Sequence, residues 1–155
     1  MKSTLALSML SMIAIVAADT AYASDYRFKD MGAFTAHGDV TVTAAAVSLP
    51  CTASLTGTTT GGARITGATF SGVSCLALTA SHLPWHMHAN ASHGFTIKDV
   101  TVEATVLGIC GPGKVKAQLN TAGVISFTGA GLPGLVPCSV SGTLKTTPKV
   151  MIVAK

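Results

Sequence analysis

Short runs in which apolar and small polar residues alternate recur along most of this chain. Alternation with a period of two is the pattern of a β-strand that buries one face and exposes the other. The pattern predicts roughly eight to ten short strands. The runs lie at residues 39–43, 64–71, 95–106, 114–119, 124–127, 139–144 and 149–153.

Turn-forming residues separate these runs at short intervals, as in Gly61-Gly62, Gly111-Pro112-Gly113 and the stretch 129–134. Such regular punctuation without helical periodicity favours an all-β fold, either a small antiparallel β-sandwich or a barrel-like domain. Hydrophobic residues make up 48% of the chain and charged residues 10%, a balance that excludes an intrinsically disordered protein.

The first 23 residues have the organisation of a secretory signal peptide. Lys2 precedes an apolar run over residues 5–18, and Ala21-Tyr22-Ala23 fits the small-x-small pattern that signal peptidase accepts. Asp19 and Thr20 interrupt the apolar run before it reaches the ~20 residues that a membrane-spanning helix needs. We therefore expect cleavage after residue 23, no transmembrane segment in the mature chain, and a secreted or extracellular location, with the periplasm as the alternative.

The remainder of the chain is predicted to form a single domain. Residues 24–37 have mixed charge and weak periodicity, so they are expected to be a flexible N-terminal arm or an edge strand, and residues 38–155 a single β domain. An outer-membrane barrel would need girdles of aromatic residues. With 1 Trp, 2 Tyr and 5 Phe, the sequence cannot build them.

The chain has four cysteines, Cys51, Cys75, Cys110 and Cys138. An even number in an exported chain predicts disulfide bonds, and their wide separation disfavours a zinc site, which would use closely spaced pairs. Three connectivities are open. We expect the sequential pairing, Cys51–Cys75 and Cys110–Cys138, because each loop then encloses one or two hairpins.

The sequence offers no catalytic machinery, so no enzyme activity and no cofactor are predicted. Asp99 and Glu103 would lie on one face of a strand, ~13 Å apart by strand rise, which is too far for a glycosidase pair. No G-x-S-x-G motif is present, and oxidised cysteines are not nucleophiles. The net charge of +4 is scattered rather than clustered, which disfavours a nucleic-acid partner.

Four histidines, His82, His86, His88 and His93, surround Trp85 and are the only local concentration of candidate metal ligands. On a strand, His86 and His88 would point to the same face, so a copper or zinc site is geometrically feasible. No carboxylate lies nearby in the sequence to orient an imidazole. A solvated surface hairpin is therefore the favoured interpretation, and no metal is expected.

Several spaced motifs of this chain resemble the PraB-type alkane oxidation protein activators, over about residues 49 to 148. The histidine cluster is not part of that family's pattern. The motifs are Leu49-Pro50-Cys51, Ile65-Thr66-Gly67-Ala68-Thr69-Phe70-Ser71-Gly72 followed by Cys75, Leu83-Pro84-Trp85, Gly108-Ile109-Cys110-Gly111-Pro112-Gly113, and Pro137-Cys138-Ser139-Val140-Ser141-Gly142-Thr143-Leu144.

The resemblance implies a non-enzymatic exported accessory that promotes growth on, or uptake of, long-chain hydrocarbons, and it supplies no catalytic residues. The low charge content independently favours association with an apolar phase or with other copies of the chain. The mild positive charge is compatible with a cell-envelope surface as a partner. An alternative function is a structural subunit of a surface fibre. In that case the segment 24–47 would add as a strand to the sheet of a neighbouring subunit, with Val40 and Val42 as its alternating apolar residues.

Overall fold

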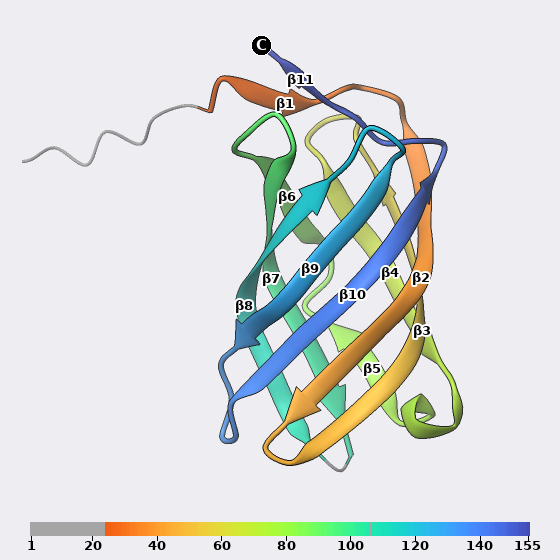
Figure 1. Ribbon diagram of the computed structural model, residues 1–155, viewed down its shortest axis with the longest axis vertical. Helices are drawn as coiled ribbons and strands as arrows, with labels where there is room; N and C mark the ends of the chain where they lie inside the picture. Colours follow the sequence, from red (N-terminus) through yellow and green to blue (C-terminus); the bar gives the residue numbers. More distant parts are fainter. Residues whose placement is uncertain (1–23, 106) are drawn as a thin grey trace, which may run out of the picture.

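The computed structural model describes residues 24–105 and 107–155, and these form a β-barrel (Figure 1). Residues 1–23, including the expected signal peptide, lie outside the described residues. The elements are β1 (Tyr26–Phe28), β2 (Ala33–Ala44), β3 (Val47–Thr58), β4 (Arg64–Ser71), the 3-10 turn η1 (Val73–Cys75), β5 (Leu78–Ser81), β6 (Trp85–Ala89), β7 (Gly94–Ala104), β8 (Gly108–Leu119), β9 (Val124–Leu132), β10 (Cys138–Thr147) and β11 (Ile152–Ala154).

The main sheet is antiparallel and closes on itself. Its strand order is β5-β7-β6-β4-β3-β2-β10-β9-β8, and an additional pairing of β7 with β8 joins the two ends. Because β5 pairs with the C-terminal part of β7 and β6 with its N-terminal part, these two short strands share one position in the wall. The result is a closed antiparallel barrel with eight strand positions, which confirms the all-β prediction and selects the barrel over the sandwich.

The alternating residues of each strand divide the barrel into an apolar interior and a polar exterior. In β2, Val40, Val42 and Ala44 are buried, whereas Thr41 and Thr43 face outward. The interior side chains form one continuous hydrophobic core that extends through the barrel. Successive residues of the alternating pattern therefore face the inside and the outside of the barrel wall in turn.

The first residues of the described chain help to close one end of the barrel. β1 pairs with β11 in a separate two-stranded sheet, and the Phe28 ring packs edge-on against Phe95 with centroids 5.3 Å apart. The segment 24–37, expected as a flexible arm or an edge strand, contains β1 and the first five residues of β2. β2 begins at Ala33 because Phe34 and Ala36 already point into the core.

Both disulfides lie toward the other end of the barrel, and their sequential pairing is as predicted. Cys51 of β3 bonds to Cys75 of η1, and Cys110 of β8 bonds to Cys138 of β10, each with Cα atoms 5.8 Å apart. All four cysteines are buried. No helix among the described residues is long and apolar enough to cross a membrane.

Candidate functional site

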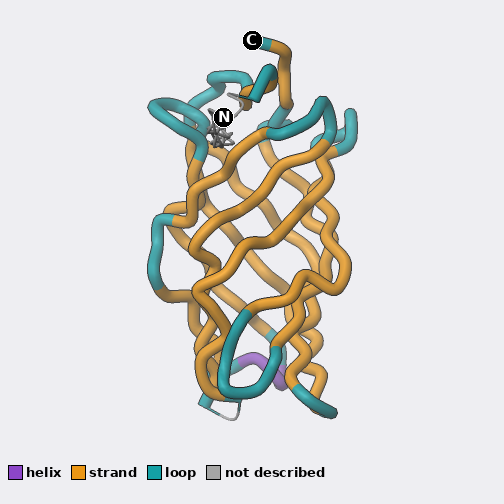
Figure 2. The backbone as a smooth tube through the Cα atoms, turned by 90° about the vertical axis from the view of Figure 1, so that its left-hand side faces the viewer, coloured by secondary structure: helices purple, strands orange, loops and turns teal. Residues whose placement is uncertain are grey.

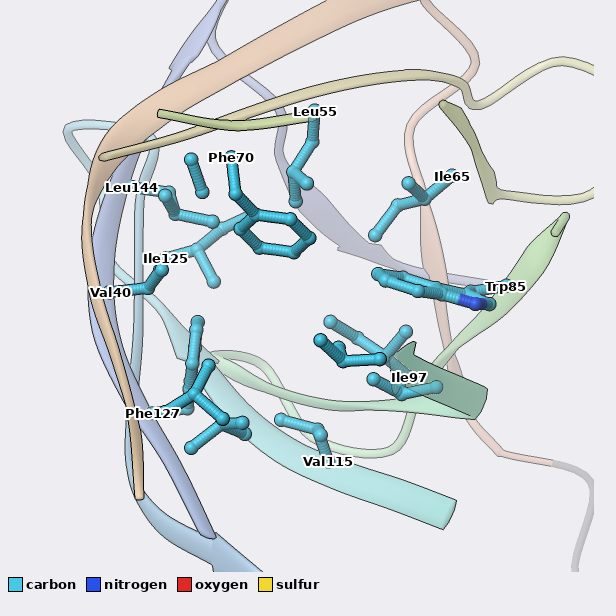
Figure 3. Close-up of a pocket in the computed structure, with 15 residues that line it drawn as sticks. Val40, Leu55, Ile65, Phe70, Trp85, Ile97, Val115, Ile125, Phe127 and Leu144 are labelled. Atoms are coloured by element: carbon cyan, nitrogen blue, oxygen red, sulfur yellow. The ribbon is translucent and has the colours of Figure 1, made fainter. Parts of the chain in front are cut away.

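An apolar cavity of about 60 Å³ lies inside the barrel. Every strand position of the wall contributes to its lining, and Figure 3 shows the Phe70 and Trp85 rings projecting into the shared space. The only polar side-chain atom among these residues, Trp85 Nε1, donates a hydrogen bond to the Ser81 carbonyl oxygen at 2.8 Å. The lining residues are Val40, Val42, Ala53, Leu55, Ile65, Phe70, Trp85, Ile97, Val100, Val102, Val115, Ile125, Phe127, Val140 and Leu144.

A cavity with this lining is chemically selective. Its walls offer neither a hydrogen-bond partner nor a charge, so a polar ligand entering it would lose its hydration without compensation. Apolar cavities of this kind stay dry and accept apolar guests. Small eight-stranded barrels have interiors wide enough either for packed side chains or for one small ligand.

The large apolar side chains that are exposed gather at one end of the barrel. Among the described residues six such side chains are exposed, and all six lie at the end of the barrel that carries the disulfides. We call this set the apolar rim. It consists of Val47 in the β2–β3 hairpin, Val73 and Leu76 at η1, Ile109 at the start of β8, and Leu135 and Val136 between β9 and β10.

The antiparallel topology gathers these residues. The strands β2, β4 and β9 terminate at the rim end of the barrel, and β3, β8 and β10 start there. The rim end is the lower end in Figures 1 and 2. The connections 45–46, 72–77 and 133–137 contain no charged residue. The opposite end is polar, with Lys29 and Asp30 between β1 and β2 and Lys149 after β10. The molecule is thus amphipathic along the barrel axis.

A family model described as "Alkane oxidation protein activator PraA/PraB-like" matches residues 1–154. The chain belongs to this family. The match confirms the resemblance seen in the sequence and extends it beyond residues 49–148. No match was found among curated proteins or among solved structures.

In this PraA/PraB-like protein the four histidines near Trp85 do not come together as a site. His86 and His88 project from the outer face of β6, and His82 and His93 are exposed in the turns on either side of it. Within residues 24–105 and 107–155 no group of three or more His, Cys, Asp or Glu side chains is placed to hold a metal ion.

The imidazole of His88 has a lowered pKa. Partial burial lowers the pKa of this imidazole below its ordinary value of 6.5, and the positive charge of Lys98 and the neighbouring His86 lower it further. Each of these influences disfavours the protonated ring. His88 therefore stays neutral to a lower pH than a free histidine.

Sequence reasoning did not identify the rim or the cavity. Val73, Leu76 and Leu135 are isolated apolar residues in turns, and a single exposed apolar residue in a sequence carries no functional signal. The available signal was the lack of charge in the connections at one end of every hairpin. This signal can be interpreted only when the strand order is known, because the strand order shows which turns lie at the same end of the barrel.

Proposed function

We propose that this PraA/PraB-like protein is an exported, non-enzymatic accessory that promotes growth on long-chain hydrocarbons. It acts by adsorbing to the hydrocarbon surface through its apolar rim. The observation that carries this proposal is the gathering of the exposed large apolar side chains at one end of an otherwise polar barrel. Contiguous exposed apolar patches on soluble proteins mark interaction sites.

The rim has the energetic capacity for adsorption. Val73 is 95% exposed and Leu76 84% exposed, and Leu135 protrudes fully, so contact with a hydrocarbon phase would remove most of their apolar surface from water. Burying one such side chain contributes about 1.5–3 kcal/mol. Adsorption needs no change of fold, because these residues are already outside the core.

Export is supported by the disulfides and the N-terminal sequence. Disulfides form and persist in oxidising compartments outside the cytoplasm. This chain has two of them. A serine–histidine pair, Ser54 Oγ and His37 Nδ1 at 2.8 Å, lies exposed to water on the outer faces of β3 and β2. Glu103, the one partly buried carboxylate in the part of the chain that the structure describes, accepts a hydrogen bond from the Ser81 hydroxyl at 3.2 Å in the barrel wall.

The fibre alternative has no observation in its favour. β2, which contains half of the segment expected to act as a donor strand, pairs with β3 on one edge and with β10 on the other. Val40 and Val42 point into their own barrel. Donation of β2 to a neighbouring subunit would require opening the barrel along both of these ladders.

The test is a deletion strain compared on hexadecane and on a water-soluble carbon source, with complementation by the wild-type gene. We expect slower growth on hexadecane only, restored by complementation, and the protein in the culture medium with its N-terminus at residue 24. Equal growth of both strains on hexadecane would refute the accessory role, and an intact Met1 in the isolated protein would refute export by signal cleavage.

A further inference from the structure

We propose that the barrel is also a binding site for a single alkyl carboxylate, with the tail inside the barrel and the carboxylate on its outer wall between β8 and β9. This site is separate from the apolar rim, so the proposal stands or falls independently of the proposed function. Three features carry it: the apolar cavity, a weakly paired seam in the wall beside it, and a cationic hollow outside that seam.

The seam lies between β8 and β9. Their ladder contains two register pairs, Gln118 with Ser126 and Leu119 with Ile125, both near the polar end of the barrel. Near the rim, the Gly111 amide donates to the Pro133 carbonyl oxygen at 2.6 Å. Between these points the ladder has no further register pair among the described residues. This stretch of the wall can therefore separate without breaking a continuous row of backbone hydrogen bonds.

The outer face of β9 along the seam is unobstructed. Gly129 and Gly131 have no side chain, and a Cβ atom placed on either would meet no atom within 4 Å. Phe127, on the same strand, lines the cavity and remains partly exposed, and its ring lies beside Gly142 of β10.

The outside of the seam is a positively charged hollow. It is lined by Lys98 of β7, by Lys114 and Lys116 of β8, and by residues 128–131 of β9, and no carboxylate among the described residues lines it. Lys114 and Lys116 flank Val115, whose side chain lines the cavity on the other face of the same strand. The cationic hollow and the apolar cavity therefore face each other across one layer of backbone.

This juxtaposition fits an amphiphile with an anionic head. The three ammonium groups attract a carboxylate, and the cavity accepts only hydrocarbon. A volume of about 60 Å³ corresponds to about four to six water-sized groups. The tail held inside is then about four to six carbons long, and a longer chain would have to leave part of itself in the seam or displace core side chains.

Trp85 makes the site directly observable, because it is the only tryptophan in the chain and it lines the cavity. We would titrate the oxidised protein with 8-bromooctanoate, whose terminal bromine quenches indole fluorescence on contact. The expected result is saturable quenching that octanoate reverses by competition. Octyltrimethylammonium chloride, with the same tail and the opposite charge, should compete about fivefold more weakly or worse.

Two kinds of variant separate the tail from the head. Ala53→Leu places three additional carbons in the cavity and should weaken binding at least tenfold without lowering the melting temperature. Should Ala53→Leu lower the melting temperature, Val140→Ile adds one methylene to the same cavity and should weaken binding to a smaller degree.

For the head, Lys114→Gln combined with Lys116→Gln should weaken octanoate binding about two- to tenfold. It should leave octyltrimethylammonium unaffected or bound more tightly. Lys145→Gln combined with Lys149→Gln removes the same charge from exposed lysines outside the hollow and should change nothing.

The outcomes that overturn the proposal are distinct. Absence of saturable quenching, or quenching that Ala53→Leu and Val140→Ile both leave unchanged, would show that no tail enters the barrel. Equal affinity for the two head groups, or equal effects of the two lysine pairs, would overturn the assignment of the carboxylate to the hollow.

Discussion

Removing the three most exposed side chains of the apolar rim should strongly weaken adsorption to hydrocarbon and leave the fold intact. The variant Val73→Ser, Leu76→Ser, Leu135→Ser changes three exposed side chains that contribute nothing to the core. At the lower limit of about 1.5 kcal/mol for each side chain, the loss is about 4.5 kcal/mol, or roughly a thousandfold in affinity. The free energy of unfolding should change by less than about 0.5 kcal/mol per substitution.

The assay is depletion of the protein from solution by hexadecane droplets, followed after centrifugation and fitted to an adsorption isotherm. The matched control is Ala91→Ser combined with Ala122→Ser, two exposed apolar residues in turns at the polar end of the barrel. The control should adsorb like the wild type. Adsorption of the rim variant within threefold of the wild type, with unchanged melting, would refute the reasoning that the rim is the contact surface.

Three further predictions concern the fold. Replacing Cys110 and Cys138 by Ala opens a loop with a sequence separation of 28 and should lower the free energy of unfolding by about 3.5 kcal/mol, measured by urea denaturation; an unchanged midpoint would contradict this. Phe95→Ala, at a side chain 1% exposed, should cost about 3–5 kcal/mol in the same measurement, and a loss below 1 kcal/mol would mean that the ring is not core. The pKa of His88 is lower in the folded chain than its ordinary 6.5, so protonation of this imidazole opposes folding. Well above pH 6.5 the imidazole is neutral in both states and does not change the stability. As the pH falls from 6.5 to the folded pKa, the imidazole destabilises the fold. His88→Gln should reduce the drop in melting temperature between pH 7.5 and 5, and NMR titration should give His88 a pKa below 6.5; a pKa above 6.5 would contradict the burial argument.

Much of the barrel could be predicted from local pattern. The alternation in 39–43, 95–106 and 139–144 reports β2, β7 and β10, because each of these strands buries one face. The strand β3 was not predicted. Its Pro50 lacks a backbone donor, and its inward residues Ala53 and Gly57 are too small to stand out from the Ser and Thr between them.

Closure of the sheet into a barrel cannot be predicted from the local sequence pattern. A sandwich and a barrel share the same alternation, and the difference here is made by β2 pairing with β10, which joins Ala44 to Cys138 across most of the chain. The sites share this dependence on long-range pairing. The cavity and the rim are each assembled from residues on many strands or turns, whereas the histidines, close in sequence, end on the outer wall.

The covalent bonds beside the rim have a consequence for what happens at an oil surface. Many proteins spread and denature irreversibly on contact with oil, because the liquid competes with their own interior for apolar residues. Here Cys51–Cys75 anchors η1 to β3, and Cys110–Cys138 fastens β8 to β10, next to the residues that would touch the liquid. Under the proposed function, a molecule fastened in this way can detach from one droplet and adsorb to another without refolding, so one copy can serve many encounters.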